Sequence, residues 1–109
     1  YSDFKQIIII NENGNCINCN NKFSREMSVL LSYSTKLFIV SGTGAKVDFS
    51  YYLDINQDNL IVDSAFIFKK YDIAKSCMII DLGEEGQFVN SFNVNAKNYA
   101  KVWDFVDRK

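Results

Sequence analysis

The chain has 109 residues, of which 48% are hydrophobic and 15% aromatic, and its formal net charge is −1. This length supplies one hydrophobic core and excludes two independent domains. The charge excludes a basic surface of the kind that binds nucleic acid, and the apolar runs are far shorter than the roughly 18 residues that cross a bilayer. The chain does not open with the charged and apolar regions of a signal peptide, so we expect a cytoplasmic location.

The first predicted element is a strand over residues 4–10, which contains the isoleucine run Ile7 to Ile10. An unbroken apolar run is typical of a central strand that is buried on both faces. Residues 11–14, Asn-Glu-Asn-Gly, predict a tight turn with Gly where positive φ is required. A second, shorter strand is predicted over residues 15–19.

A helical region follows, in one or two segments from Ser24 as N-cap to about Ile39. Residues 46–55 then alternate apolar and polar side chains, which is the pattern of a half-buried strand. After a turn at residues 56–59, residues 60–68 are predicted to return as the antiparallel partner in a long hairpin.

Residues 77–82 predict the fifth strand, and residues 87–94 predict a short final strand. The last segment, residues 95–109, has apolar residues at helical spacing, which predicts a helix that packs on the domain or on a partner. We therefore expect one domain over residues 1–94, followed by an output or docking helix.

The opening segment, residues 7–23, resembles the start of a PAS domain. It has an apolar strand, an amide or acidic turn ending in Gly14, a short apolar strand, and then Asn20 with Phe23 three positions later. The segment over residues 78–83 is similar to the closing Asp-Ile-Thr strand of the family, but it has Gly where Thr is usual.

The resemblance implies an α+β fold with a five-stranded antiparallel sheet in the order 2-1-5-4-3, helices on one face and a C-terminal helix. It also implies a module of a larger signalling protein that senses a small molecule or dimerises and signals through the terminal helix. The implied partners are a second copy of the chain, an adjoining signalling domain or another protein.

Cys16 and Cys19 have the C-x-x-C spacing of redox and zinc sites. On a strand, residues three apart point to opposite faces, so these thiols would not converge unless the backbone bulged. A tetrahedral zinc site needs further ligands, and the chain has no His and only one other cysteine, Cys77. We therefore predict two small apolar strand residues, no metal site, and a buried free thiol at Cys77 in a reducing compartment.

The absence of His also excludes the His-ligated haem of common haem-binding PAS domains, while a non-covalent flavin or a small apolar ligand remains compatible with the sequence. The inward faces of the long hairpin and the fifth strand predict a ligand-binding wall of Phe49, Tyr51, Phe66 and Met78. The alternative is that these side chains simply fill the core.

No nucleophile in the sequence has an evident base, so we predict that the chain is not an enzyme. A second function suits this absence of catalytic residues, the small size and the mild acidity. In that interpretation the chain is a stand-alone inhibitor or immunity-type protein that binds and blocks a partner protein.

Overall fold

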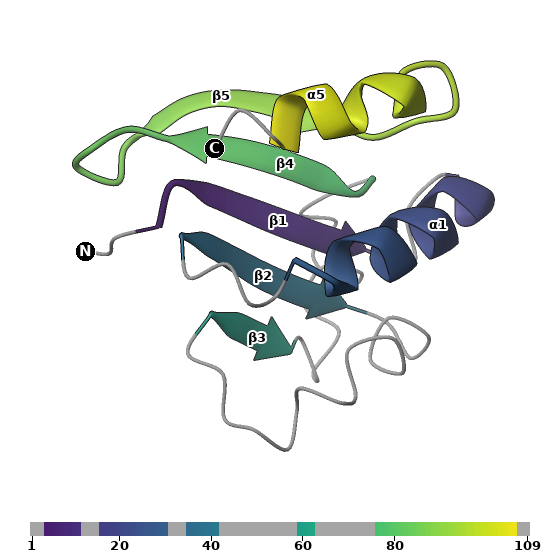
Figure 1. Cartoon of the computed structure of the whole chain (residues 1–109), viewed down its shortest axis with the longest axis horizontal. Coiled ribbons are helices and arrows are strands. Elements are labelled where there is room, and N and C mark those ends of the chain that lie inside the picture. Colours follow the sequence, from purple (N-terminus) through teal and green to yellow (C-terminus); the bar gives the residue numbers. More distant parts are fainter. Residues whose placement is uncertain (1–3, 12–15, 31–34, 42–58, 63–75, 107–109) are drawn as a thin grey trace.

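The structure is a computed structural model, which describes residues 4–11, 16–30, 35–41, 59–62 and 76–106 (Figure 1). In chain order, the elements are β1 (Gln6–Asn11), α1 (Ile17–Ser28), β2 (Lys36–Ser41), β3 (Leu60–Val62), β4 (Met78–Leu82), β5 (Phe88–Asn93), the 3-10 helix η1 (Tyr99–Lys101) and α5 (Val102–Val106). Neither of the described α-helices is long and apolar enough to cross a membrane.

The strands form one mixed sheet in the order β3-β2-β1-β4-β5. β1 and β2 run parallel, and so do β2 and β3, whereas β4 is antiparallel to β1 and β5 is antiparallel to β4 (Figure 1). The parallel connection from β1 to β2 contains α1, which makes this part of the chain a β-α-β unit.

The predicted antiparallel sheet in the order 2-1-5-4-3 was therefore wrong. The expected strand over residues 15–19 does not exist, because residues from Ile17 onward are helical. Residues 36–39, predicted as the end of the helical region, belong instead to β2, which pairs parallel with β1. The central position of the isoleucine-rich strand was predicted correctly, as was its neighbour β4.

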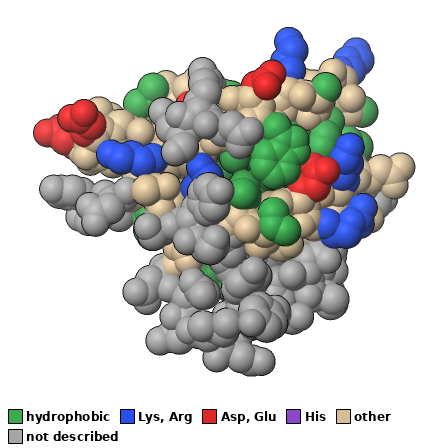
Figure 2. All heavy atoms as spheres, viewed as in Figure 1, with side chains coloured by type: hydrophobic (Ala, Val, Ile, Leu, Met, Phe, Trp, Pro, Cys, Tyr) green, Lys and Arg blue, Asp and Glu red, His purple; other side chains and the backbone are tan. Residues whose placement is uncertain are grey.

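The predicted long hairpin falls largely outside the described residues, because none of residues 46–55 is described. Of its returning strand, residues 60–62 form β3, which pairs parallel with β2. A tight turn joins β4 to β5: Gly86 has a φ of 81°, and its N–H donates to the Gly83 carbonyl at 3.0 Å. The exposed Glu84 and Glu85 lie in this turn, and the connection between β4 and β5 lies at the left of Figure 1. Acidic side chains protrude on the same side in Figure 2.

The largest hydrophobic cluster among the described residues lies on one face of the sheet, and α1 and α5 pack on that face. α1 begins earlier than predicted, because Cys19, Phe23 and Met27 recur every four residues and all three are buried. The same hydrophobic cluster contains inward-facing strand residues and the terminal helix; its strand members are Ile8, Ile10, Phe38, Val40 and Ile79. Hydrophobic side chains gather between α1 and the terminal helix in Figure 2.

The C-terminal helical region begins later than predicted, at Tyr99, and its described part consists of η1 and α5. The Asn95 side chain accepts hydrogen bonds from the backbone N–H groups of Lys97 and Asn98, so it caps a turn before η1. Val102 and Val106 are buried in the core cluster. The predicted apolar stripe therefore packs on the sheet of its own domain.

A buried polar network ties the end of α5 to the sheet. Lys36 Nζ donates to Gln6 Oε1 at 2.8 Å, and Gln6 Nε2 donates to Asp81 Oδ1 at 2.8 Å. The Gln6 amide also donates to the Phe105 carbonyl at 3.2 Å, and the Lys36 ammonium lies 3.5 Å from the Val106 carbonyl oxygen. Three strands and α5 thus share one set of hydrogen bonds.

Candidate functional site

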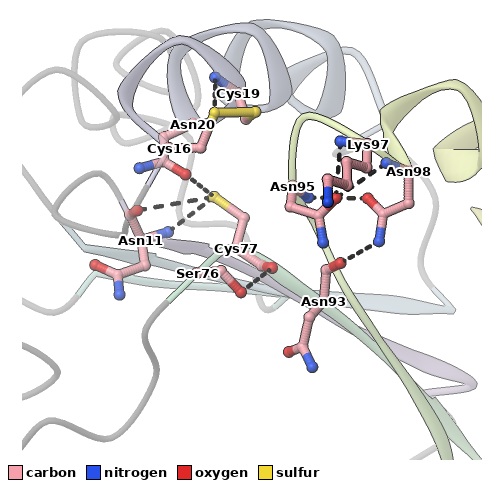
Figure 3. The surroundings of a disulfide bond; sticks show 10 residues. All are labelled: Asn11, Cys16, Cys19, Asn20, Ser76, Cys77, Asn93, Asn95, Lys97 and Asn98. Carbon is pink, nitrogen blue, oxygen red and sulfur yellow. Dashed lines mark hydrogen bonds between the residues drawn. A yellow bond between two sulfur atoms is a disulfide. The ribbon is translucent and has the colours of Figure 1, made fainter.

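The two cysteines that are close in sequence are joined where β1 gives way to α1. Cys16 is the N-cap of α1, with extended backbone angles (φ −110°, ψ 97°), and Cys19 lies in the first turn. The two form a disulfide, with their Cα atoms 5.2 Å apart (Figure 3). The disulfide therefore sits at the N-terminus of the helix in the β-α-β unit.

The helix backbone points one hydrogen-bond donor at the sulfur of Cys16. The N–H of Cys19 donates to Cys16 Sγ at 3.3 Å, and the N–H of Asn20 donates to the Cys16 carbonyl at 2.9 Å. The N-terminus of a helix carries a partial positive charge, and a thiolate at that position is stabilised by it. The reduced pair would therefore hold a thiolate at Cys16 more easily than a cysteine in an apolar strand would.

The two cysteines differ in their exposure. Cys19 is 7% exposed and belongs to the core cluster, whereas Cys16 is partly exposed and packs against that cluster. Cys16 is therefore the more exposed of the two cysteines. Attack on one defined sulfur is what thiol–disulfide exchange requires.

The prediction that these cysteines are small strand residues was wrong. An N-cap residue and the residue three positions later lie on the same side of a helix, whereas on a strand they lie on opposite faces. The missed signal was a C-x-x-C pair between an apolar strand and a segment with helical spacing, in a β-α-β pattern, which is typical of redox motifs.

Cys77 lies directly before β4 and is a free, fully buried thiol, as predicted. Its sulfur accepts a hydrogen bond from the Asn11 N–H at 3.4 Å, and its S–H donates to Asn20 Oδ1 at 3.3 Å (Figure 3). Burial raises the pKa of the Cys77 thiol to about 12, and the hydrogen bond from Asn11 opposes this only in part. Cys77 therefore stays protonated at neutral pH and does not compete as a nucleophile.

The predicted ligand wall is only partly placed. Phe49, Tyr51 and Phe66 lie outside the described residues, and Met78 is a half-buried residue of β4. The ligand site and its flavin or small apolar ligand stay predictions.

The resemblance to PAS domains was wrong, since its opening strand–turn–strand unit is a strand followed by a helix and the sheet is not antiparallel. The functions of a sensor or dimerisation module in signal transduction depended on that resemblance, and they are overturned with it. The inhibitor or immunity-type function was wrong as well, because it depended on the absence of reactive residues. A disulfide at the N-terminus of a helix is such a reactive group.

No family model matches the chain, and no curated protein sequence is significantly similar to it. Among solved structures, the chain is similar to the crystal structure of the pneumococcal exposed lipoprotein thioredoxin (Etrx1) from Streptococcus pneumoniae strain TIGR4. The two are 15% identical, with a TM-score of 0.44, over 96% of this chain and 86% of that one. A likeness this loose assigns neither family nor activity, and the chemistry of the site depends on Cys16 and Cys19 themselves.

Proposed function

We propose that this protein carries out thiol–disulfide exchange with a dithiol or disulfide of another molecule. The observation that carries the proposal is the Cys16–Cys19 disulfide at the N-terminus of α1, where Cys16 is partly exposed and Cys19 is buried. The site needs neither His nor metal for this chemistry, because the helix terminus supplies the stabilisation of the thiolate.

In the oxidising direction, a substrate thiolate attacks Cys16 Sγ and the bond between Cys16 and Cys19 breaks. Cys19 leaves as a thiolate and takes up a proton, and a mixed disulfide joins Cys16 to the substrate. A second substrate thiolate then attacks the substrate sulfur of that bond, and Cys16 leaves as a thiolate. The substrate has lost two electrons to form a disulfide, and the protein has gained them as a dithiol.

The reverse sequence reduces a substrate disulfide, and the reduction potential of the pair relative to its compartment sets the direction. A cytoplasmic location stays a prediction; there the dithiol form would dominate and the pair would act as a reductant. The prediction that the chain is not an enzyme is likewise untested, and turnover in exchange would overturn it.

The test is catalysis of the reduction of insulin disulfides by dithiothreitol, followed by light scattering as the reduced chain precipitates. Wild-type protein should accelerate the reaction at substoichiometric concentration, and Cys16→Ser should abolish the acceleration. Cys19→Ser should instead trap a mixed disulfide on Cys16 that is visible by mass spectrometry. A wild-type rate equal to that of Cys16→Ser would mean that the disulfide is only a structural crosslink.

A further inference from the structure

Cys77 lies where three segments that flank the disulfide meet. The N–H of Asn11, the last residue of β1, donates to its sulfur, and its S–H donates to Asn20 in the first turn of α1. Its backbone carbonyl accepts from the Val94 N–H at 2.9 Å, which fixes Cys77 to the end of β5. The thiol thus connects the sheet to the turn that contains Cys19.

Water does not substitute for these contacts. Cys77 is 0% exposed, Asn20 is 1% exposed and Asn11 is 2% exposed. Because buried polar groups that lose a partner are not compensated by solvent, the hydrogen bonds of the Cys77 thiol to Asn11 and Asn20 constrain the position of the first turn.

We propose that Cys77 is a positioning residue for the exchange reaction: it holds the first turn of α1 against the end of β1 and so keeps the Cys19 N–H aimed at Cys16 Sγ. This inference deepens the proposed function and depends on it for its biological meaning. The contacts on which it is built are independent of any substrate.

The consequence differs between the oxidised and reduced states. In the disulfide form, the covalent bond itself holds the two sulfurs together. In the dithiol form, the Cys19 N–H must stabilise a thiolate at Cys16, and hydrogen bonds to charged groups are the stronger ones. Loss of the contacts to Cys77 should therefore destabilise the reduced form more than the oxidised form, which lowers the reduction potential.

The experiment measures the reduction potential of the Cys16–Cys19 pair in glutathione buffers, by trapping free thiols with an alkylating reagent and counting them by mass. Cys77→Ala removes the hydrogen bonds of the thiol to Asn11 and Asn20. It should favour the disulfide by about tenfold, which corresponds to a potential about 30 mV more negative. Cys77→Ser keeps a donor and an acceptor, and it should stay within about twofold of wild type because the hydrogen bonds persist.

Ile79→Val is the matched control, because it alters a buried residue of β4 without changing a hydrogen-bonding group. Its potential should equal that of wild type although its stability falls. Cys77→Ala with an unchanged potential, or Cys77→Ser with the same shift as Cys77→Ala, overturns the proposal. These outcomes do not depend on insulin reduction, so an inactive protein whose potential still responds to Cys77 refutes the proposed function alone.

Discussion

The hydroxyl of Tyr99 donates a hydrogen bond of 2.6 Å to Glu26 Oε1, which joins η1 to the helix that begins with the disulfide. The ammonium of Lys22 lies 4.6 Å from the centroid of the same tyrosine ring. Lys22 and Glu26, which lie one turn apart on α1, therefore both contact the side chain of Tyr99. This contact supports the far end of α1, whereas Cys77 supports its first turn.

Tyr99→Phe should lower the free energy of unfolding by about 1 kcal/mol, because it removes the hydrogen bond and keeps the ring over Lys22. Urea denaturation of Tyr99→Phe, Glu26→Gln and the double variant forms a double-mutant cycle for the pair. A coupling energy near zero would show that the contact contributes nothing. The insulin assay should be unaffected, because neither residue touches the disulfide.

Because the pKa of Cys77 is raised in the folded protein, the free energy of unfolding should fall as the pH becomes alkaline. The pKa of the thiol is about 9 in the unfolded chain and about 12 in the folded protein. The contribution of the buried, protonated thiol to the free energy of unfolding is therefore complete below pH 9 and is lost between pH 9 and 12. Over this range, wild type should lose up to about 1.4 kcal/mol per pH unit more than Cys77→Ser does. Urea titrations of both proteins at several alkaline pH values measure the difference, and parallel pH profiles would contradict the burial of the thiol.

Because Lys36 belongs to the buried hydrogen-bond network at the amino end of β1, its substitution should destabilise the protein strongly. Lys36→Met should destabilise the protein by about 3 kcal/mol, because it removes the cation from a set of hydrogen bonds that includes the carboxylate of Asp81. Lys101→Met is the control, since Lys101 is exposed, and it should change stability by less than about 0.5 kcal/mol. Equal effects of the two substitutions in thermal unfolding would show that the network stabilises nothing.

The three cysteines should react in a fixed order. After reduction under native conditions, an alkylating reagent should modify Cys16 first and Cys19 slowly, because Cys19 is 7% exposed. Cys77 should react only after unfolding, since it is fully buried. Time-resolved mass spectrometry of proteolytic peptides measures the order, and early labelling of Cys77 would contradict the packing described above.

The centre of the sheet could be predicted from sequence, because a run of four isoleucines is buried in any sheet that contains it. The relative direction of the neighbouring strands could not be predicted, because the parallel pairing of β1 with β2 depends on α1, which connects the two strands. The sequence pattern predicts a helix over residues 36–39, and the antiparallel sheet was implied by the resemblance to PAS domains.

The candidate site could not be predicted because the predicted start of α1, at Ser24, was seven residues later than its actual start at Ile17. Ser24 is a favourable N-cap residue, so the sequence predicts a helix that begins only there. The helix begins earlier because Cys19, Phe23 and Met27 recur every four residues and their burial stabilises the additional turns. Once the helix begins at Ile17, the two cysteines converge and their chemistry follows.

The most direct measurement of the central claim is the reduction potential of the Cys16–Cys19 pair in wild-type protein, in equilibrium with glutathione. An exchange-competent pair at the N-terminus of a helix should give a value between about −120 and −270 mV, the range of proteins that exchange disulfides. A reduction potential below about −300 mV would identify the disulfide as a structural crosslink and would contradict the proposed function.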